Sequence, residues 1–292
     1  MQKLIISVIL VCLILLLVFN NRSPYVSDSP VIYTIFAGRD FNLDILTKYL
    51  DKLIDSGKIQ EVHLWDFTRK DSDSVYIRNL ENTKEKYKVM HVENKGAWAE
   101  YYNHYKDPKY SDNIIIKSDD DIMFIDIDKF DDFIEARKKS DCWLMFPSIV
   151  NNGVTSFHQQ QDGLIPESVY KLEYETFWGT VVTNGDVGKK LHEYFVNNKD
   201  EFLQKARAND KIIDIPIGDR TSINFFAMFG KDFQSLGQID DDEHEITVEY
   251  PKVVQKRNTI YSSFVVAHGS FGSQKEKMSD EFVSGLYSKL LS

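Results

Sequence analysis

The stretch Asn113-Ile-Ile-Ile-Lys-Ser-Asp-Asp-Asp-Ile-Met-Phe-Ile125 places three adjacent carboxylates between two apolar runs. The β-branched run at residues 114–116 is typical of a central strand of a parallel sheet, which is buried on both faces. Such a strand delivers its carboxyl end to the ligand crevice of an open α/β sheet. Adjacent carboxylates repel one another, and a divalent cation with oxygen ligands would relieve that repulsion. The stretch therefore predicts a cation site at a strand end; the alternative is an acidic turn that only solvates the strand end.

The composition describes an acidic globular protein. Its 292 residues suffice for one large α/β domain or two small ones. The net charge of −10 argues against nucleic acid as the main partner, because a phosphate backbone needs a basic surface. The two cysteines, Cys12 and Cys142, are too few for a disulfide framework or a Cys-based zinc site.

The N-terminus carries an apolar run, residues 4–19, which only Ser7 interrupts. As a helix it would span about 24 Å, slightly short of a bilayer core of about 30 Å. The sequence Phe-Asn-Asn-Arg at residues 19–22 lacks the small residues of a signal-peptidase site, which favours an uncleaved signal-anchor over a cleaved signal peptide. We expect a transmembrane segment over residues 1–22, a short stem over residues 23–30 and a globular domain over residues 31–292.

The first part of that domain alternates strand and helix patterns. Strands are predicted at 31–37, 61–67 and 87–92, helices at 42–56 and 96–105, and a polar helix or loop at 71–85. The aromatic side chains of the second helix, Trp98, Tyr101, Tyr102 and Tyr105, are expected to pack in the core. This alternation up to the Asp triplet is typical of βαβ units and a parallel sheet.

The second part is less regular. We predict helices at 128–139 and 187–197, strands at 142–146, 176–182 and 259–267, and a long polar loop at 151–166. Another apolar run ends at Asp219 and is expected to lead into an apolar helix through residue 229. The acidic residues 240–245 are expected to be a solvated charge run.

Residues 117–125, Lys-Ser-Asp-Asp-Asp-Ile-Met-Phe-Ile, resemble the Lys-Thr-Asp-Asp-Asp-Val-Phe-Val stretch of β-1,3-galactosyltransferases. More broadly they resemble the Asp-x-Asp motif of GT-A glycosyltransferases. In that superfamily the motif follows the fourth strand of the nucleotide-binding half, which is its place here by strand count. The resemblance implies a GT-A-like, Rossmann-type α/β fold with a mixed, mainly parallel sheet and flanking helices. Residues 31–125 would be the nucleotide-binding half and residues 126–292 the acceptor half.

The resemblance also implies roles for the acidic motif and for a histidine near the chain end. Asp119 would contact the donor, Asp121 the metal, Mn²⁺ or Mg²⁺, and Asp120 either of them. His268 follows a predicted strand, where many GT-A enzymes bring a histidine back to the metal; the alternative is a lone histidine in a glycine-rich loop. A neutral imidazole is a reasonable ligand for Mn²⁺.

Other expected donor contacts follow from position in the fold. Arg39 ends the first strand, where the donor pyrophosphate or base would lie, and Asp66 ends the second, where related enzymes hold uracil or ribose. Trp178 and Gly179 would form a sugar-facing wall, since aromatic rings stack on sugar C–H faces and glycine permits close approach. The alternatives are a surface turn, a cap and a core tryptophan.

An inverting transferase needs a carboxylate that takes the proton from the acceptor hydroxyl. Asp219, at the end of an apolar run, is the predicted catalytic base, although the resembled family has Glu-Asp-Val there and the match is partial. Glu173, Glu175 and the acidic residues 240–245 are rivals.

The sequence thus predicts a metal-dependent glycosyltransferase that moves a sugar from a UDP- or GDP-sugar to a hydroxyl of a glycan or glycoprotein acceptor. It would be a single-pass type II membrane protein with its catalytic domain in the secretory-pathway lumen. Two alternatives remain at this point. One is a two-metal nucleotidyltransferase or phosphohydrolase, and the other is a non-catalytic, membrane-anchored domain that binds carbohydrate or metal.

Overall fold

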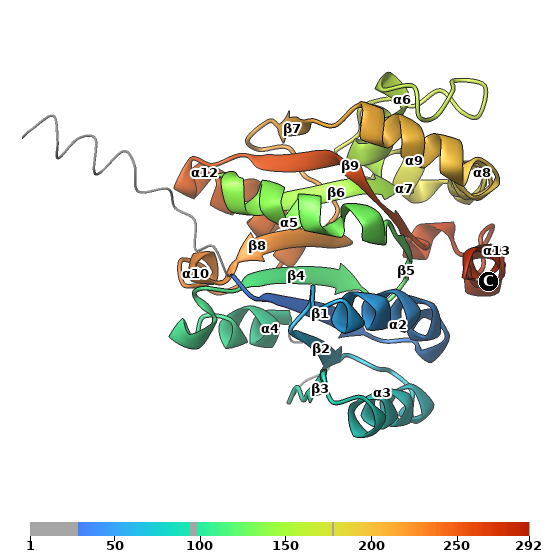
Figure 1. Cartoon of the computed structure of the whole chain (residues 1–292). Helices are drawn as coiled ribbons and strands as arrows, with labels where there is room; N and C mark the ends of the chain where they lie inside the picture. Colours follow the sequence, from blue (N-terminus) through green and yellow to red (C-terminus); the bar gives the residue numbers. More distant parts are fainter. Residues whose placement is uncertain (1–28, 94–97, 177, 292) are drawn as a thin grey trace, which may run out of the picture.

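The computed structural model describes residues 29–93, 98–176 and 178–291. A nine-stranded sheet runs through the molecule, and helices lie on both of its sides (Figure 1). The strand order is β3-β2-β1-β4-β8-β6-β9-β5, with β7 paired to β9. The mixed α/β fold predicted from the sequence is confirmed.

The first half of the sheet is parallel, as predicted. β1 (Val31–Ala37) pairs with β2 (Glu61–Asp66) and with β4 (Ile114–Asp119), and β2 pairs with β3 (Tyr87–Met90). The connecting helices are α2 (Asp40–Asp55), α3 (Asp71–Thr83) and α4 (Trp98–His104). All six residues of the central strand β4 except Asp119 are buried. The Asp triplet therefore begins at the carboxyl end of the fourth, central strand.

A crossing of the chain behind the triplet decides the geometry of the site. β5 (Ile122–Ile125) does not stay beside β4 but pairs antiparallel with β9 (Asn258–His268) at the far edge of the sheet order. In this register Ile122 lies opposite His268. The turn between β4 and β5 therefore carries Asp120 and Asp121 to the end of β9.

The second half of the sheet is mixed. Four of its pairings are antiparallel (β4 with β8, β5 with β9, β6 with β8, and β7 with β9), and β6 with β9 is parallel. The remaining elements are α5 (Phe130–Lys139), β6 (Met145–Val150), α6 (Gly153–Gln161), α7 (Thr180–Thr183), α8 (Gly185–Asn197), α9 (Lys199–Ala208), β7 (Ile212–Ile215), β8 (Phe225–Phe229), α10 (Gly230–Phe233), α11 (Asp242–His244), α12 (Tyr250–Val254) and α13 (Asp280–Tyr287). A π-helical turn, Glu245–Glu249, joins α11 to α12, and short 3₁₀ turns lie at Pro108–Tyr110, Ile127–Lys129, Gly272–Gln274 and Ser288–Leu290.

Three predicted elements of this half are wrong. The expected loop at 151–166 contains α6, because the Asn152 side chain accepts a hydrogen bond from the Thr155 amide and caps a helix start. The described part of the expected strand at 176–182 forms the short helix α7. The apolar helix expected to reach residue 229 is the strand β8, whose short apolar run is buried between β4 and β6. The strand predicted at 142–146 lies later, at β6.

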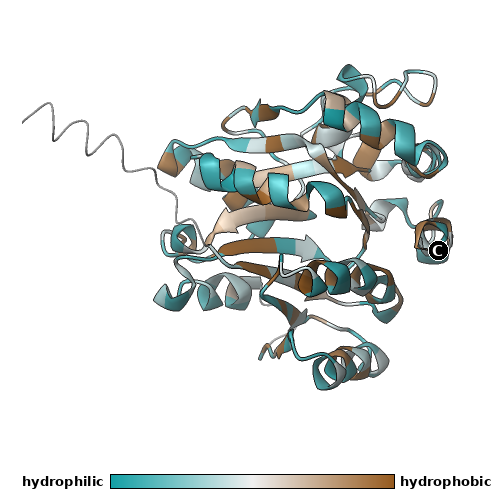
Figure 2. Cartoon of the chain, in the orientation of Figure 1, coloured by the Kyte–Doolittle hydropathy of each residue, from teal (hydrophilic) through white to brown (hydrophobic). Residues whose placement is uncertain are grey.

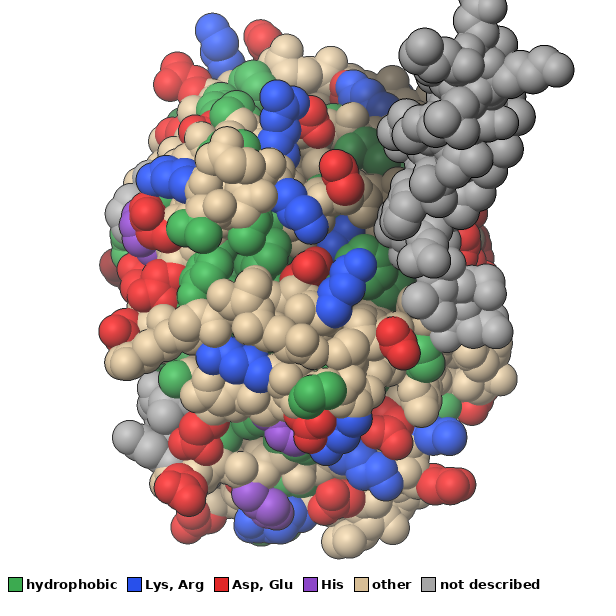
Figure 3. Space-filling model, turned by 90° about the vertical axis from the view of Figure 1, so that its left-hand side faces the viewer, with side chains coloured by type: hydrophobic (Ala, Val, Ile, Leu, Met, Phe, Trp, Pro, Cys, Tyr) green, Lys and Arg blue, Asp and Glu red, His purple; other side chains and the backbone are tan. Residues whose placement is uncertain are grey.

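The apolar side chains gather where helices meet the sheet. Figure 2 shows brown strands in the centre and teal outer faces on the helices. Figure 3 shows acidic and basic side chains interspersed on one face, with hydrophobic side chains scattered among them. In the described part of the chain, no helix is long and apolar enough to cross a bilayer. The predicted anchor at residues 1–22 and most of the predicted stem lie outside the described residues.

Candidate functional site

A cleft of about 530 Å³ opens at the carboxyl ends of β1 and β4. Its lining includes all three residues of the Asp triplet, and Arg39 and His268. The remaining lining residues are Phe36, Gly38, Phe67, Arg69, Trp98, Asn224, Ser270, Phe271, Gly272 and Lys275. The topology therefore gathers most of the predicted site residues, from both halves of the chain, into one cleft.

Asp119, Asp121 and His268 form a candidate metal site within the cleft. One ligand atom from each of these residues lies within 4.8 Å of those of the other two. The pairing of β5 with β9 brings His268 to Asp121, and the Gly269 amide donates to the Asp121 carbonyl at 2.7 Å. Two carboxylates and an imidazole are a ligand set that suits Mn²⁺ and related divalent cations.

Two polar atoms at this site are buried without a hydrogen-bond partner. They are Oδ1 of Asp121 and Nδ1 of His268, and both side chains are 3% exposed. His268 Nε2 lies 3.4 Å from the same Asp121 oxygen. A buried polar atom without a partner costs free energy, on the order of 1–3 kcal/mol. A cation bound to Asp121 Oδ1 would remove that cost at the carboxylate, so the residues present fit a metal ion.

Arg39 neutralises part of the acidic cluster. Its guanidinium donates to both oxygens of Asp120 and lies 3.1 Å from Asp121 Oδ2. Burial raises the pKa of Asp120 to about 6, against the opposing effect of Arg39. Burial also opposes ionisation of Asp121, but the charges of His268 and Arg39 outweigh it and lower the pKa of that carboxyl. Asp121 is therefore ionised and ready to bind a cation at neutral pH.

The other side of the cleft is aromatic and basic. The rings of Phe36 and Trp98 are stacked at 5.9 Å, and Phe67 meets Trp98 edge-on at 5.0 Å. Three cations, Arg39, Arg69 and Lys275, also line the cleft. Tyr101, Tyr102 and Tyr105 are buried as predicted, whereas Trp98 faces the cleft. An aromatic wall suits a planar base, and cations suit phosphate groups.

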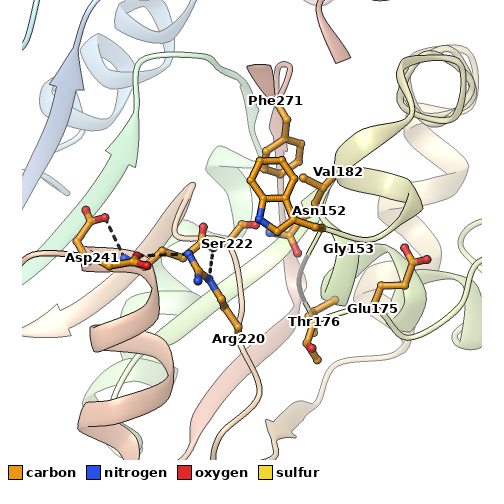
Figure 4. Close-up of a pocket in the computed structure, with 13 residues that line it drawn as sticks. Asn152, Gly153, Glu175, Thr176, Val182, Arg220, Ser222, Asp241 and Phe271 are labelled. Carbon is orange, nitrogen blue, oxygen red and sulfur yellow. Dashed lines mark hydrogen bonds and ion pairs between the residues drawn. The ribbon is translucent and has the colours of Figure 1, made fainter. Parts of the chain in front are cut away.

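A smaller cavity of about 280 Å³ adjoins the cleft, and Phe271 lines both. It is lined by four acids, Glu175, Asp241, Asp242 and Glu243, and by Arg220. Figure 4 shows Arg220 in the middle, with Asp241 on one side and Glu175 on the other. Arg220 lies 2.7 Å from Glu243 and 3.3 Å from Asp241. The cavity keeps an excess of acidic side chains beside the metal site.

Two of these acids have raised pKa values. Burial raises the pKa of Asp242, and the positive charge of Lys117 only partly offsets it. Burial likewise raises the pKa of Glu243, against the opposing effect of Arg220. Carboxyls with raised pKa values beside a cleft are candidates for proton transfer.

Three predicted site residues lie elsewhere or make local contacts. Asp66 is buried but does not line the cleft; its carboxylate accepts hydrogen bonds from Thr68 and from Ser74, at 2.9 Å from the latter. Asp219 lines neither cavity and accepts from the Tyr174 hydroxyl at 2.8 Å. A side chain at Gly179 would collide with the side chain of Glu175, so close packing against Glu175 requires glycine at this position.

Trp178, predicted to form a sugar-facing wall, is not in the lining of the cleft that holds the Asp triplet. It lines the smaller cavity, is 60% exposed and has a backbone φ of 48°, in the left-handed region. Non-glycine residues adopt that region at a cost that often marks a functional site. Its role as a donor contact stays a prediction.

The sequence-based prediction named the acids of the smaller cavity only as rivals of Asp219 for the catalytic base. Residues 240–245 were expected to be solvated, whereas Asp242 and Glu243 are half-buried at the start of α11. Burial of this run depends on contacts distant in sequence, such as the 3.2 Å hydrogen bond from Tyr102 to Asp242. No local pattern reports such a contact.

No protein-family model matches the chain, and no curated protein matches it. Among solved structures it is similar to a 4-diphosphocytidyl-2C-methyl-D-erythritol synthase from Anaerococcus prevotii, at 11% identity and a TM-score of 0.43, over 90% of this chain and 99% of that one. It is also similar to GalNAc-T7 with UDP, GalNAc and Mn²⁺, at 12% identity and a TM-score of 0.47, over 85% of this chain and 47% of that one. Likenesses this distant carry no argument about activity, and neither structure is a β-1,3-galactosyltransferase. The residues of the site therefore carry any inference about function.

Proposed function

We propose that the protein is a metal-dependent glycosyltransferase that uses a nucleotide-sugar donor, a UDP- or GDP-sugar, and a hydroxyl acceptor on a glycan or glycoprotein. The observation that carries the proposal is the triad Asp119, Asp121 and His268 in the lining of a large cleft, where Asp121 Oδ1 is buried without a hydrogen-bond partner. A second, acid-lined cavity adjoins that cleft, which suits a reaction between two substrates.

In this proposal Asp119, Asp121 and His268 would hold Mn²⁺ or Mg²⁺. When bound, such an ion supplies Lewis-acid stabilisation of the diphosphate leaving group. Phe36 and Trp98 would hold the nucleobase, because they form the aromatic wall. Arg69 and Lys275 would contact the diphosphate, and Arg39 would neutralise the acids beneath it. Asp120 would act through Arg39, with which it shares several hydrogen bonds.

Asp242 would take the acceptor proton in this proposal, with Glu243 beside it in the same cavity. It lines the smaller cavity, and its pKa is raised by burial. Asp219 was expected in this role, but the cavity lining does not include it. Aromatic contact from Trp178 would hold the acceptor or donor sugar in the same cavity.

We also propose that residues 1–22 anchor the protein in a membrane, with the domain in the secretory-pathway lumen. The support is the apolar run at residues 4–19 and the absence of a peptidase site after it.

A panel of nucleotide sugars, incubated with the protein and Mn²⁺, tests the proposal by release of the nucleoside diphosphate. We expect hydrolysis of at least one UDP- or GDP-sugar, abolished by chelation, and a rise in melting temperature with UDP or GDP plus Mn²⁺. Release of pyrophosphate from a nucleoside triphosphate instead would favour a nucleotidyltransferase. Binding without turnover of any donor would favour a non-catalytic domain. The absence of both binding and turnover would refute the transferase.

A further inference from the structure

Lys117 is a buried lysine in contact with the acidic motif. Its side chain is 2% exposed, and Nζ donates to Asp119 Oδ1 at 2.6 Å and to the Ile223 carbonyl at 2.9 Å. The same ammonium lies 4.5 Å from the centre of the Phe36 ring. Lysine is almost never fully buried unless it is paired. The pairing here is with a residue of the candidate metal site.

Asn224 holds the other oxygen of the same carboxylate. Its Nδ2 donates to Asp119 Oδ2 at 3.1 Å, and its backbone carbonyl accepts from the Asp119 amide at 2.9 Å. Its own Oδ1 accepts from Asn152 Nδ2 at 3.3 Å, which fixes the amide with its donor toward Asp119. Asn152 lines the smaller cavity, and Asn224 lines the cleft. Both oxygens of Asp119 thus have a defined donor.

The sheet explains why these residues meet. Side chains two apart on a strand share a face, so Lys117 and Asp119 point to the same side of β4. β8 runs antiparallel to β4 with Ser118 opposite Phe225, which places Asn224 beside Asp119. The Lys117 ammonium also donates to the carbonyl of Ile223, the residue before Asn224. The arrangement is therefore built into two rigid strands.

We propose that Lys117 and Asn224 are positioning residues that fix the orientation of the Asp119 carboxylate for metal binding. The inference deepens the proposed function and rests on its metal site. Lys117 would compensate the negative charge of Asp119, one of the three adjacent carboxylates. Asn224 would set the rotation of the carboxylate, so that Asp119 offers its remaining lone pairs toward Asp121 and His268. Residues that orient metal ligands in this way typically contribute about 10–100-fold to metal affinity or activity.

The test is the Mn²⁺ dissociation constant, measured by calorimetry and by the electron paramagnetic resonance of free Mn²⁺, on the chain without substrates. We expect Lys117→Met and Asn224→Ala each to weaken binding about 10-fold or more. Lys58→Met is a matched control, because Lys58 pairs with Asp131 away from the cleft. It should leave the dissociation constant unchanged. If Lys117→Met does not fold, Asn224→Ala decides, because it removes a single neutral hydrogen bond.

A double-mutant cycle with Asp119→Asn separates positioning from general destabilisation. Once Asp119 is an amide, removal of Lys117 should weaken Mn²⁺ binding no further. Fully additive losses, or unchanged affinity in both single variants, would overturn the proposal. Wild-type protein that binds no Mn²⁺ would instead refute the metal site, and with it the proposed function. Normal Mn²⁺ binding in Asn224→Ala and Lys117→Met, with intact transfer, would refute only the positioning role.

Discussion

The three carboxylates Asp119, Asp120 and Asp121 pair with two cationic side chains of the chain itself. Lys117 forms an ion pair with Asp119, and Arg39 forms ion pairs with Asp120 and Asp121. One oxygen of Asp121 keeps no hydrogen-bond partner. The cluster therefore retains an uncompensated negative site that faces His268, and this is the property that a bound cation would use.

Asp121→Asn should remove metal binding while the fold persists. The amide keeps the shape of the side chain and removes repulsion from its acidic neighbours, but it also gives up the attraction of His268 and Arg39 that lowers the pKa of Asp121. The melting temperature without metal should therefore fall modestly. The wild-type protein should gain about 2.7 kcal/mol of stability at a Mn²⁺ concentration 100 times its dissociation constant. The variant should lose that gain in thermal denaturation with and without Mn²⁺. Equal metal-dependent stabilisation in both proteins would contradict the role of Asp121.

Asp242→Asn should lower kcat by about 10²–10⁴-fold with little change in donor KM, as expected for loss of a general base. Because the base must be ionised and burial raises its pKa, the acid limb of the wild-type pH profile should lie above the ordinary aspartate value of about 3.9. Activity should fall as the pH falls through that limb. Steady-state kinetics across pH measure both effects.

Asp219→Asn is the matched comparison, since it makes the same chemical change outside both cavities. We expect it to change kcat only a few-fold. If Asp219→Asn suppresses transfer and Asp242→Asn does not, the base is Asp219, as the sequence alone suggested.

Residues in the acidic motif could be predicted because their chemistry is local. Three adjacent acids after an apolar strand are recognisable as a candidate site from the sequence alone, and so is Arg39 at the end of a strand. Lys117 could have been found by the same reasoning, since it lies two residues before Asp119 on one face of a strand. Asn224 could not, because it lies beside no recognisable motif and is placed by the pairing of β4 with β8. Asp242 was only one of several rival acids for the base, because contacts distant in sequence place it in the cavity.

At the scale of elements, α8 and α13 support the end of β9 through one histidine. His192, on α8, shares a hydrogen bond at 2.8 Å with Tyr287 of α13, and its other nitrogen donates to the Gly269 carbonyl at 2.9 Å. A neutral ring that donates through Nε2 has Nδ1 left to accept from the Tyr287 hydroxyl. Burial lowers the pKa of His192 to about 4. The segment that follows His268 is thereby tied to two helices.

This contact should make stability depend on pH. The unfolded chain protonates His192 near pH 6.5, and the folded protein only near pH 4, so the folded state binds fewer protons between these values. The free energy of unfolding should therefore fall as the pH falls across that window, by at most about 3 kcal/mol from this residue. His192→Gln should be less stable at pH 7 but should lose less stability on acidification. Denaturant unfolding at pH 7 and pH 4.5 measures the difference.

His91→Gln is the control, because His91 is exposed. Its unfolding curves should match those of the wild type at both pH values. A His192→Gln protein whose stability falls in parallel with the wild type would show that His192 does not titrate as stated.

Elements with a clear period could be predicted, and those without one could not. The strands and helices of the first half were placed to within a few residues, because buried strands alternate there with amphipathic helices. β8 was predicted as a helix because a run such as Phe-Phe-Ala-Met-Phe is apolar on every side and has no period to read. α6 was not predicted because its buried face includes the polar residues Thr155, Ser156 and Gln159, so its sequence has no apolar helical period.

At the scale of the whole molecule, the site depends on a crossing that no single segment contains. β5 leaves the parallel half and joins β9, and β8 returns between β4 and β6. These two pairings bring His268 and Asn224 to the Asp triplet. The sequence could suggest that His268 reaches the metal only through a family resemblance, because strand order beyond βαβ units is set by long-range packing.

The start of β1 predicts where the domain can be separated from the N-terminus. Ser29 is buried, and the Pro30 carbonyl accepts hydrogen bonds from the Ile114 amide at 3.0 Å and from Asn113 Nδ2 at 3.3 Å. A chain that begins at residue 28 keeps these contacts. It should fold, remain in solution without detergent and bind Mn²⁺ with the affinity of the 292-residue chain. Circular dichroism, sedimentation and calorimetry measure the three properties.

A chain that begins at residue 33 is the matched control, because it lacks Val31 and Ile32, which pair with Ile114 and Ile115 of β4. It should be less stable than the chain from residue 28, since β1 lies between β2 and β4 and is shortened at its start. The 292-residue chain should partition into membranes, because the apolar run at residues 4–19 is then present. If it stays in solution like the chain from residue 28, the proposed anchor is wrong, whatever the activity of the domain. If the chain from residue 28 does not fold, the N-terminal segment contributes to the domain itself.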